Sequence, residues 1–156
     1  MRVHVAGTWK SPESLGDLDP RKLDDAERAA IDFIRNWQAG KSSFTFHTSG
    51  STGEPRPISF RREQLMASAQ LSIEALRLKA GMKVLVCLDA RFVAGALMLV
   101  RCLVNSMDII LQRPTSHPFS LYSEPVDFVA LVPLQVSLLL DENPSLLNRR
   151  MTVIIG

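Results

Sequence analysis

The sequence predicts an α/β fold built from parallel βαβ units. Four apolar runs have the length of strands and lack the alternation of a half-exposed strand, which is typical of strands buried on both faces; they cover residues 84–88, 108–111, 127–132 and 152–155. Segments with helical character separate them, an almost entirely apolar one at 92–105 and one at 133–140 that Pro133 can open. Because strands joined through helices run parallel and cross over right-handed, these segments predict a parallel sheet covered by helices.

Two further helices are expected in the first half of the chain. Residues 24–39 place apolar side chains at the 3.6-residue period of an amphipathic helix. Asp24 and Asp25 favour its positive amino end, and Gly40 can end it. A second helix is expected at 62–79, with Gly81 just beyond its end.

The hydrophobic period changes at Ser43. Phe44 and Phe46 alternate with polar residues, as in a half-buried strand, and a polar loop follows at 48–54. Residues 55–60 are expected to form an edge strand, because Pro55 and Pro57 place their missing N–H groups on the same side. Residues 1–22 are expected to be an irregular leader with at most one short strand at 3–6, and residues 23–156 to be part of a domain.

Composition excludes several classes of protein. The chain has 156 residues, 46% of them hydrophobic and 22% charged, which is typical of a globular protein rather than a disordered one. A net charge of +2 and 6% aromatic residues do not favour nucleic-acid binding. The longest apolar run, 92–100, is shorter than the roughly 18 residues of a membrane span, and residues 1–10 have no signal-peptide layout, so a cytoplasmic location is expected. The pattern leaves the oligomeric state open.

The cysteines do not indicate a disulfide or a zinc site. Cys87 and Cys102 both lie in apolar runs, where a thiol behaves as a small buried hydrophobe, and no histidine is near either of them in the sequence. No metal site is therefore expected from the residues of this chain.

The segment 48–56 has the residue types of an anion-binding loop. It holds four hydroxyl side chains, two glycines and one guanidinium. Gly50 and Gly53 permit positive φ angles that can aim successive N–H groups at one anion, and Arg56 can add charge-assisted hydrogen bonds. The Walker A pattern is excluded because its second glycine would fall at Pro55. By composition alone, a solvated hairpin turn is an equally good interpretation.

The order of these residues resembles a known family. Thr-Ser-Gly-Ser-Thr-Gly-Glu-Pro-Arg at 48–56 is similar to the signature loop of AMP-forming acyl-CoA synthetases and related adenylating enzymes, in which the last position is usually Lys rather than Arg56. The resemblance continues at 84–95, 125–140 and 151–156, so that it covers about residues 40–156. It implies an incomplete copy of that family's large amino-terminal domain. The family's frequent histidine falls at Phe92 here.

This resemblance implies a function and a set of site residues. The family activates a carboxylic acid with ATP and Mg²⁺ to an acyl-adenylate, and then transfers the acyl group to CoA. No catalytic residue is assigned within 1–156. The residues implied for the phosphates of ATP are Thr48, Ser49, Gly50, Ser51, Thr52, Gly53 and Arg56, and those implied for the wall of the acyl pocket are Phe92, Val93 and Gly95.

The resemblance indicates the substrate acid less specifically than it indicates the reaction. The runs FTFHTSGSTGEP and LVRCLV resemble the o-succinylbenzoate–CoA ligases of menaquinone biosynthesis. A fatty, aryl or amino acid as the substrate, or a non-catalytic nucleotide-binding module, are the alternatives. The family's later adenine-binding turn, its metal-binding acid and its catalytic lysine are not found in the sequence, so residues 1–156 alone are expected to lack ligase activity.

Two polar residues near this segment are interpreted as structural. His47 is expected to point inward from its strand and to be satisfied by the core, with contact to a phosphate as the alternative. Arg101, in an almost entirely apolar helix, is expected to pair with a buried acid or to extend its guanidinium to solvent.

Overall fold

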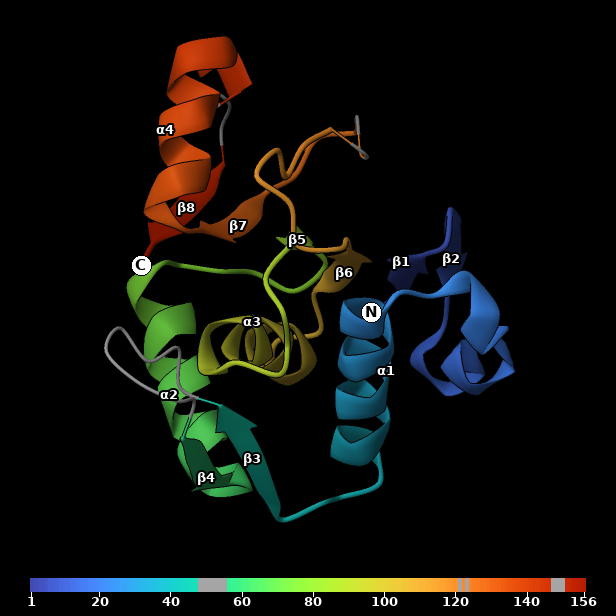
Figure 1. Ribbon diagram of the computed structural model, residues 1–156. Coiled ribbons are helices and arrows are strands. Elements are labelled where there is room, and N and C mark those ends of the chain that lie inside the picture. The colour runs from blue at the N-terminus through green and yellow to red at the C-terminus, as the bar shows by residue number, and fades with distance from the viewer. Residues whose placement is uncertain (48–55, 121, 123, 147–150) are drawn as a thin grey trace.

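The protein is described here by a computed structural model that covers residues 1–47, 56–120, 122, 124–146 and 151–156. It contains a six-stranded sheet in the order β2-β1-β6-β5-β7-β8 and a separate two-stranded sheet, β3-β4 (Figure 1). The strands are β1 Val3–Val5, β2 Thr8–Lys10, β3 Ser43–His47, β4 Pro57–Arg61, β5 Lys83–Val86, β6 Asp108–Leu111, β7 Phe128–Leu131 and β8 Thr152–Ile155. The helices are α1 Asp25–Gln38, α2 Arg62–Ala75, α3 Val93–Val104 and α4 Pro133–Glu142, with short 3₁₀ turns at Pro12–Asp17, Pro20–Lys22 and Pro144–Leu146.

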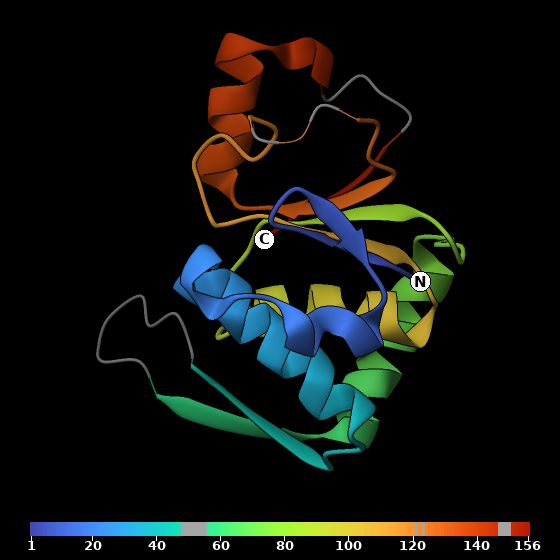
Figure 2. The same cartoon turned by 90° about the vertical axis from the view of Figure 1, so that its right-hand side faces the viewer.

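The predicted parallel βαβ units are confirmed. The unit β5-α3-β6 pairs its strands in parallel, as does the unit β7-α4-β8, and β5 and β7 are also parallel neighbours. Helix α4 covers one face of the sheet, whereas α1, α2 and α3 lie on the other (Figures 1 and 2). Within the sheet, β6 lies next to β5 toward one edge, and β7, the next strand along the chain, lies next to β5 toward the opposite edge. The strand order therefore reverses between β5 and β7, which is where open α/β sheets bind ligands.

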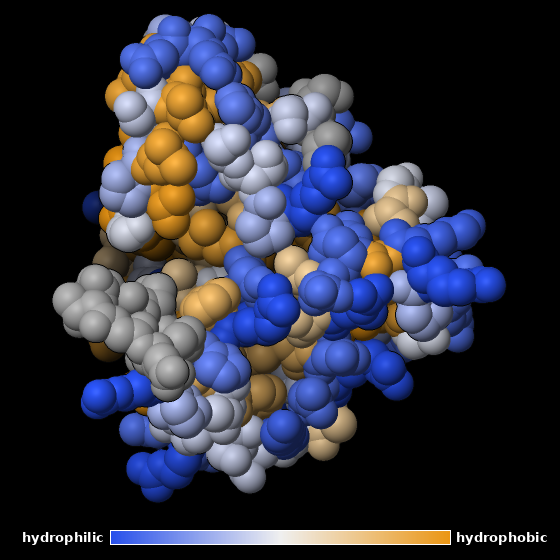
Figure 3. Space-filling model, in the orientation of Figure 1, coloured by the Kyte–Doolittle hydropathy of each residue, from blue (hydrophilic) through white to orange (hydrophobic). Residues whose placement is uncertain are grey.

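Alternate residues of the central strands pack into two cores. Val84 and Val86 of β5 face the larger core, under α1, α2 and α3. Leu85 faces a smaller core under α4, together with Val129 and Leu131 of β7. This burial on both faces is the physical reason why these strands read as continuous apolar runs. Figure 3 shows further apolar residues gathered on the outside of α4, where Leu134 and Leu140 are 63% and 54% exposed.

Helix α1 begins at a capping box. The carboxylate of Asp24 accepts a hydrogen bond from the N–H of Glu27 at 2.8 Å, and Glu27 in turn accepts one from the N–H of Asp24 at 3.0 Å. The expected start and end of this helix are confirmed to within one residue, and Gly40 beyond it has a φ of 77°. Its buried face then supports the β3-β4 hairpin.

An aromatic cluster holds the hairpin against α1. The ring of Phe33 on α1 lies 4.9 Å from that of Phe44 and 6.1 Å from that of Phe46, both on β3. Trp37 stacks beside Phe33 at 6.0 Å, and the guanidinium of Arg62, at the start of α2, lies 3.9 Å over the Trp37 ring. The segment between β3 and β4 is thus carried by a hairpin with an apolar base.

Two expectations are corrected by the structure, and a third is confirmed. The segment 1–22 is not irregular, because β1 and β2 form a hairpin and β1 pairs in parallel with β6, where the backbone N–H and the guanidinium of Arg2 bind the Asp108 carboxylate at 2.7 and 2.8 Å. Helix α2 ends at Ala75 rather than at residue 79, since Arg77 takes a φ of 53°. The edge strand expected at 55–60 is confirmed as β4, which starts at Pro57 and, among the described strands, pairs only with β3; Pro55 lies outside the described residues.

Both thiols are buried and free, as predicted. Cys87 donates a long hydrogen bond to the carbonyl of Ala130 at 3.6 Å. Burial raises the pKa of the Cys87 thiol to about 12 and raises the pKa of the Cys102 thiol as well. Among the described residues, none of the helices is both long and apolar enough to cross a bilayer.

Because both thiols are buried, we expect the free energy of unfolding to decrease at alkaline pH. Because a thiol in an unfolded chain has a pKa of about 8.5, the unfolded state binds fewer protons than the folded state above that pH. The free energy of unfolding should be insensitive to these groups at about pH 7, and should then fall as the pH rises from about 9 toward about 12. Urea unfolding across this range measures the slope, and a Cys87→Ala/Cys102→Ala double variant should show a shallower one. Equal slopes would contradict the buried-thiol explanation.

Candidate active site

A cavity of about 500 Å³ lies at the carboxyl ends of β5, β7 and β8, beside the start of α3. It is therefore at the point where the strand order reverses, the usual ligand position in an open α/β sheet. Its wall is mainly apolar, with one guanidinium and one imidazole. It is lined by His47, Leu88, Phe92, Val93, Ala94, Leu97, Arg101, Ala130, Leu131, Ile154 and Gly156.

The turn between β5 and α3 forms part of the wall of this cavity. Asp89 accepts hydrogen bonds from the backbone N–H of Arg91 at 2.8 Å and from its guanidinium, and the N–H of Phe92 bonds the Asp89 carbonyl at 3.1 Å. Burial raises the pKa of the Asp89 carboxyl, but the hydrogen bonds from Arg91 outweigh burial and leave that pKa below its usual value. This turn places Phe92 and Val93, two of the expected pocket residues, in the cavity wall.

Gly95, the third expected pocket residue, supports the wall from behind. It is buried and does not line the cavity. A Cβ atom at this position would lie 2.3 Å from the carbonyl oxygen of Asp89 and 2.6 Å from that of Leu88. The absence of a side chain lets α3 pack directly on the backbone of the turn, and this contact fixes where Phe92 and Val93 lie.

Arg101 brings a cation into the apolar wall. It lies two turns along α3 from Val93, and its Nη2 donates to the hydroxyl of Ser72 at 3.3 Å, while its Nη1 contacts the Met98 sulfur at 3.6 Å. Within the described part of the chain, its buried Nε has no hydrogen-bond partner and no carboxylate pairs with its guanidinium. Burial lowers the pKa of the guanidinium. The expected pairing with a buried acid is therefore not found in the described part of the chain, and the sequence did not indicate that this side chain would reach a cavity.

His47 differs from its prediction. It is exposed at the end of β3 rather than inward, because Phe44 and Phe46 take the inner face and successive residues of a strand alternate. Its side chain lines the cavity, and its N–H donates to the carbonyl of Arg91 at 3.0 Å. This bond, with the bridge between His47 and Phe92, joins the β3-β4 hairpin to the start of α3.

The expected phosphate-binding segment falls mostly outside the described residues. Thr48, Ser49, Gly50, Ser51, Thr52 and Gly53 are all in that part of the chain. Arg56 is described; it is exposed and comes directly before β4. The two ends of the segment, His47 and Pro57, are partners in the β3-β4 ladder, and His47 also borders the cavity.

Comparison with known proteins gives matches among solved structures. Neither protein-family models nor curated protein sequences match the chain. An acyl-CoA synthetase (AMP-forming)/AMP-acid ligase II-like protein from Dyadobacter fermentans is 36% identical, with a TM-score of 0.77, over 91% of this chain and 41% of that protein. The chain therefore spans less than half the length of this relative.

Two more distant structures share the fold. An o-succinylbenzoate CoA synthetase from Bacillus subtilis is 23% identical, with a TM-score of 0.60, over 72% of this chain and 30% of that one. The N-terminal domain of FACL13 from Mycobacterium tuberculosis is 17% identical, with a TM-score of 0.58, over the same two shares. With its mostly parallel sheet, its βαβ units and its similarity to the Dyadobacter fermentans protein, the chain has the α/β fold of the N-terminal domain of AMP-forming acyl-CoA synthetases.

Proposed function

We propose that this chain is part of an enzyme that activates a carboxylic acid carrying a second carboxylate, with o-succinylbenzoate as the leading candidate. In the first step, an oxygen of one carboxylate bonds to the α-phosphorus of ATP, and pyrophosphate leaves with the bonding electrons. In the second step, the CoA thiol loses its proton and attacks the acyl carbon, and AMP leaves. The similarity to an AMP-forming acyl-CoA synthetase-like protein supports the adenylation step, and the proposal adds the nature of the acid.

The guanidinium of Arg101 in an apolar cavity carries the proposal. A partly buried cation without a carboxylate partner is costly, and a bound carboxylate would relieve that cost through charge-assisted hydrogen bonds. The apolar wall around it, from Leu97 to Ala130 and Leu131, suits a hydrocarbon or aromatic ring. An acid with a ring and two carboxylates matches both features, because one carboxylate can pair with Arg101 while the other reacts.

The position of the hairpin supports ATP as the second substrate. The segment 48–56 is tethered at His47 to the edge of the same cavity, so phosphates held there would lie near the reacting carboxylate. Thr48, Ser49, Ser51, Thr52 and Arg56 are proposed to hold these phosphates, and Gly50 and Gly53 to let the backbone close on them. The o-succinylbenzoate CoA synthetase from Bacillus subtilis has also been solved in complex with ATP and a magnesium ion.

The described residues do not provide a site for magnesium by themselves. They contain no group of three or more His, Cys, Asp or Glu side chains arranged to hold a metal ion. Magnesium in proteins is commonly held by one or two carboxylates together with substrate phosphates and waters. No step of the reaction is therefore assigned to residues of this chain acting on the metal.

Removal of the Arg101 charge should penalise the diacid selectively. In the natural full-length enzyme, Arg101→Met is expected to lower kcat/KM for o-succinylbenzoate by about thirtyfold, because a hydrogen-bonded charge pair contributes about 2 kcal/mol. ATP–pyrophosphate exchange measures the first step directly. The matched substrate is 4-oxo-4-phenylbutanoate, which lacks only the carboxylate on the ring and should be affected little.

Two controls make this result specific. Arg101→Lys should recover part of the loss, since it restores the charge without the planar fork. Arg35→Ala, which removes an exposed arginine of α1 that does not line the cavity, should leave exchange unchanged. Equal losses for the diacid and the monoacid would contradict the assignment of a second carboxylate, but not the adenylation itself.

A further inference from the structure

A second cavity, of about 350 Å³, lies at the carboxyl ends of β1 and β6. It shares no lining residue with the cavity at α3. Its size is within the range of small-molecule sites, and its position follows the rule that ligands bind beyond the carboxyl ends of parallel strands. The polar side chains that line it and carry the following argument are His4, Lys22, Asp24, Glu27, Gln112 and Arg113.

Gln112 is a buried group in this wall that requires a partner. The residue is 8% exposed, and its backbone N–H continues the sheet by donating to the carbonyl of Val86 at 3.1 Å. Both polar atoms of its side chain, Oε1 and Nε2, are buried and have no hydrogen-bond partner among the residues that the structure describes. Buried polar groups are almost always paired, and an unpaired one is costly. A carboxamide offers an acceptor beside a donor, which is the pattern that Gln uses to bind the edge of a purine.

The cavity also has charges that suit a phosphate. Lys22 and Arg113 are exposed at its rim, and neither takes part in an ion pair with the described residues. Cations of this kind bind phosphate through charge-assisted hydrogen bonds. The amino end of α1, which opens at the same wall, adds a positive partial charge.

The two carboxylates in the wall suit a sugar. One oxygen of Asp24 and one of Glu27 are engaged in the capping box of α1. Each carboxylate therefore keeps a second oxygen that can accept from a hydroxyl, as acidic residues do with ribose. His4, whose ring packs against Trp9 at 5.2 Å and Tyr122 at 5.4 Å, gives the cavity an aromatic side against which a base can lie.

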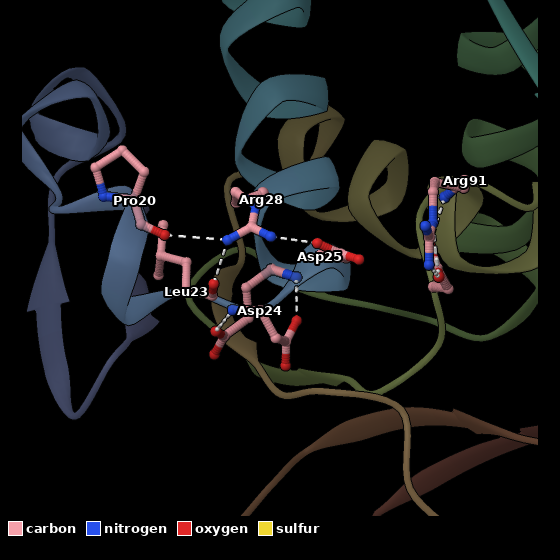
Figure 4. Close-up of polar contacts among 8 residues, drawn as sticks. Pro20, Leu23, Asp24, Asp25, Arg28 and Arg91 are labelled. Carbon is pink, nitrogen blue, oxygen red and sulfur yellow. Dashed lines mark hydrogen bonds and ion pairs between the residues drawn. The ribbon is translucent and has the colours of Figure 1, made fainter.

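This wall is held in place before any ligand binds. The guanidinium of Arg28 bonds the carbonyls of Pro20 and Leu23 and the carboxylate of Asp25, so that the turn carrying Lys22 is fixed to the first turn of α1 (Figure 4). Side chains that are already ordered lose little entropy on binding.

We infer that this cavity binds a purine nucleoside monophosphate, with Gln112 at the base edge, Asp24 and Glu27 at the ribose, and Lys22 and Arg113 at the phosphate. The terminal torsion of a glutamine side chain is broad, so the Gln112 amide can turn to match its oxygen and nitrogen to the donor and acceptor of the base. The site is independent of the proposed adenylation, because none of its residues belongs to the segment 48–56 or to the cavity at α3.

Titration of the ¹⁵N-labelled 156-residue chain with AMP, followed by NMR, tests this site locally. The side-chain amide of Gln112 and the backbone amides of Lys22 and Arg113 should shift together at one saturating affinity. Gln112→Met should weaken AMP by about tenfold to a hundredfold at these reporters, and should raise the melting temperature because an unpaired buried amide is removed. Arg113→Ala should weaken AMP without a change in melting temperature.

The controls separate this site from others. Arg77→Ala removes an exposed arginine that does not line this cavity and should leave AMP binding unchanged. Nucleotide bound at the segment 48–56 would shift Arg56 and not Gln112, so either site can fail without the other. The inference is overturned if AMP leaves the Gln112 amide unshifted, if Gln112→Met binds AMP as the parent does, or if inorganic phosphate alone binds as tightly as AMP.

Discussion

Replacement of Phe33 by alanine is expected to lower the free energy of unfolding by about 4 kcal/mol, within the range for removal of a buried aromatic ring. Phe33 is 7% exposed, and its ring packs against those of Trp37, Phe44 and Phe46. The loss includes the contacts that hold the β3-β4 hairpin on α1. Urea unfolding of the chain, followed by circular dichroism, measures the change.

The same substitution should act unevenly across the fold. Because the hairpin loses its apolar base, amide hydrogen exchange in β3 and β4 should accelerate more than exchange in the central strands β5 and β7. Phe33→Leu is the matched control and should cost much less, since it retains most of the buried volume. A uniform loss of protection in all strands would show that the cluster supports the whole fold and not the hairpin in particular.

Gly95→Ala is expected to cost about 3 kcal/mol, at the upper end for overpacking a tight site. The added methyl would lie 2.3 Å from the Asp89 carbonyl oxygen and 2.5 Å from its carbon. These are backbone atoms, so no side-chain rotation can relieve the contact, and either α3 or the turn before it must shift. Denaturant unfolding measures the cost. Because the turn carries Phe92 and Val93, the shift should also deform the cavity and weaken binding of the acid proposed to occupy it.

Gly16→Ala is the control for this prediction. A Cβ atom there meets nothing closer than 4.0 Å, where the guanidinium of Arg35 lies, so the free energy of unfolding should change by less than about 0.5 kcal/mol. If Gly95→Ala proved as harmless as Gly16→Ala, the close packing of α3 on the turn would be refuted, together with the explanation of how the cavity wall is positioned.

Part of the candidate site could be read from the sequence, and part could not. The segment 48–56 stands out because its residue types are unusual at any position, and Phe92 and Val93 were found through their resemblance to a family pattern. The exposure of His47 could have been found as well, since the inward positions of Phe44 and Phe46 already require it to point outward. Arg101 carried no such signal, because an arginine in an apolar helix looks the same whether it faces a neighbouring helix or a cavity.

The sequence by itself determined the class of fold and the elements from α1 onward. Local periodicity and continuous apolar runs depend on which faces of a strand or helix are buried, and the chain records this directly at β5, β6, β7 and β8. Only the tertiary structure decided what the elements bring together. The strands β1 and β6 pair in parallel, and Arg2 and Asp108, which are 106 residues apart, form hydrogen bonds beside this pairing. Both cavities are likewise lined by segments that lie far apart in the chain. Such contacts leave no periodic trace, because they depend on how whole elements pack and not on any local run of residues.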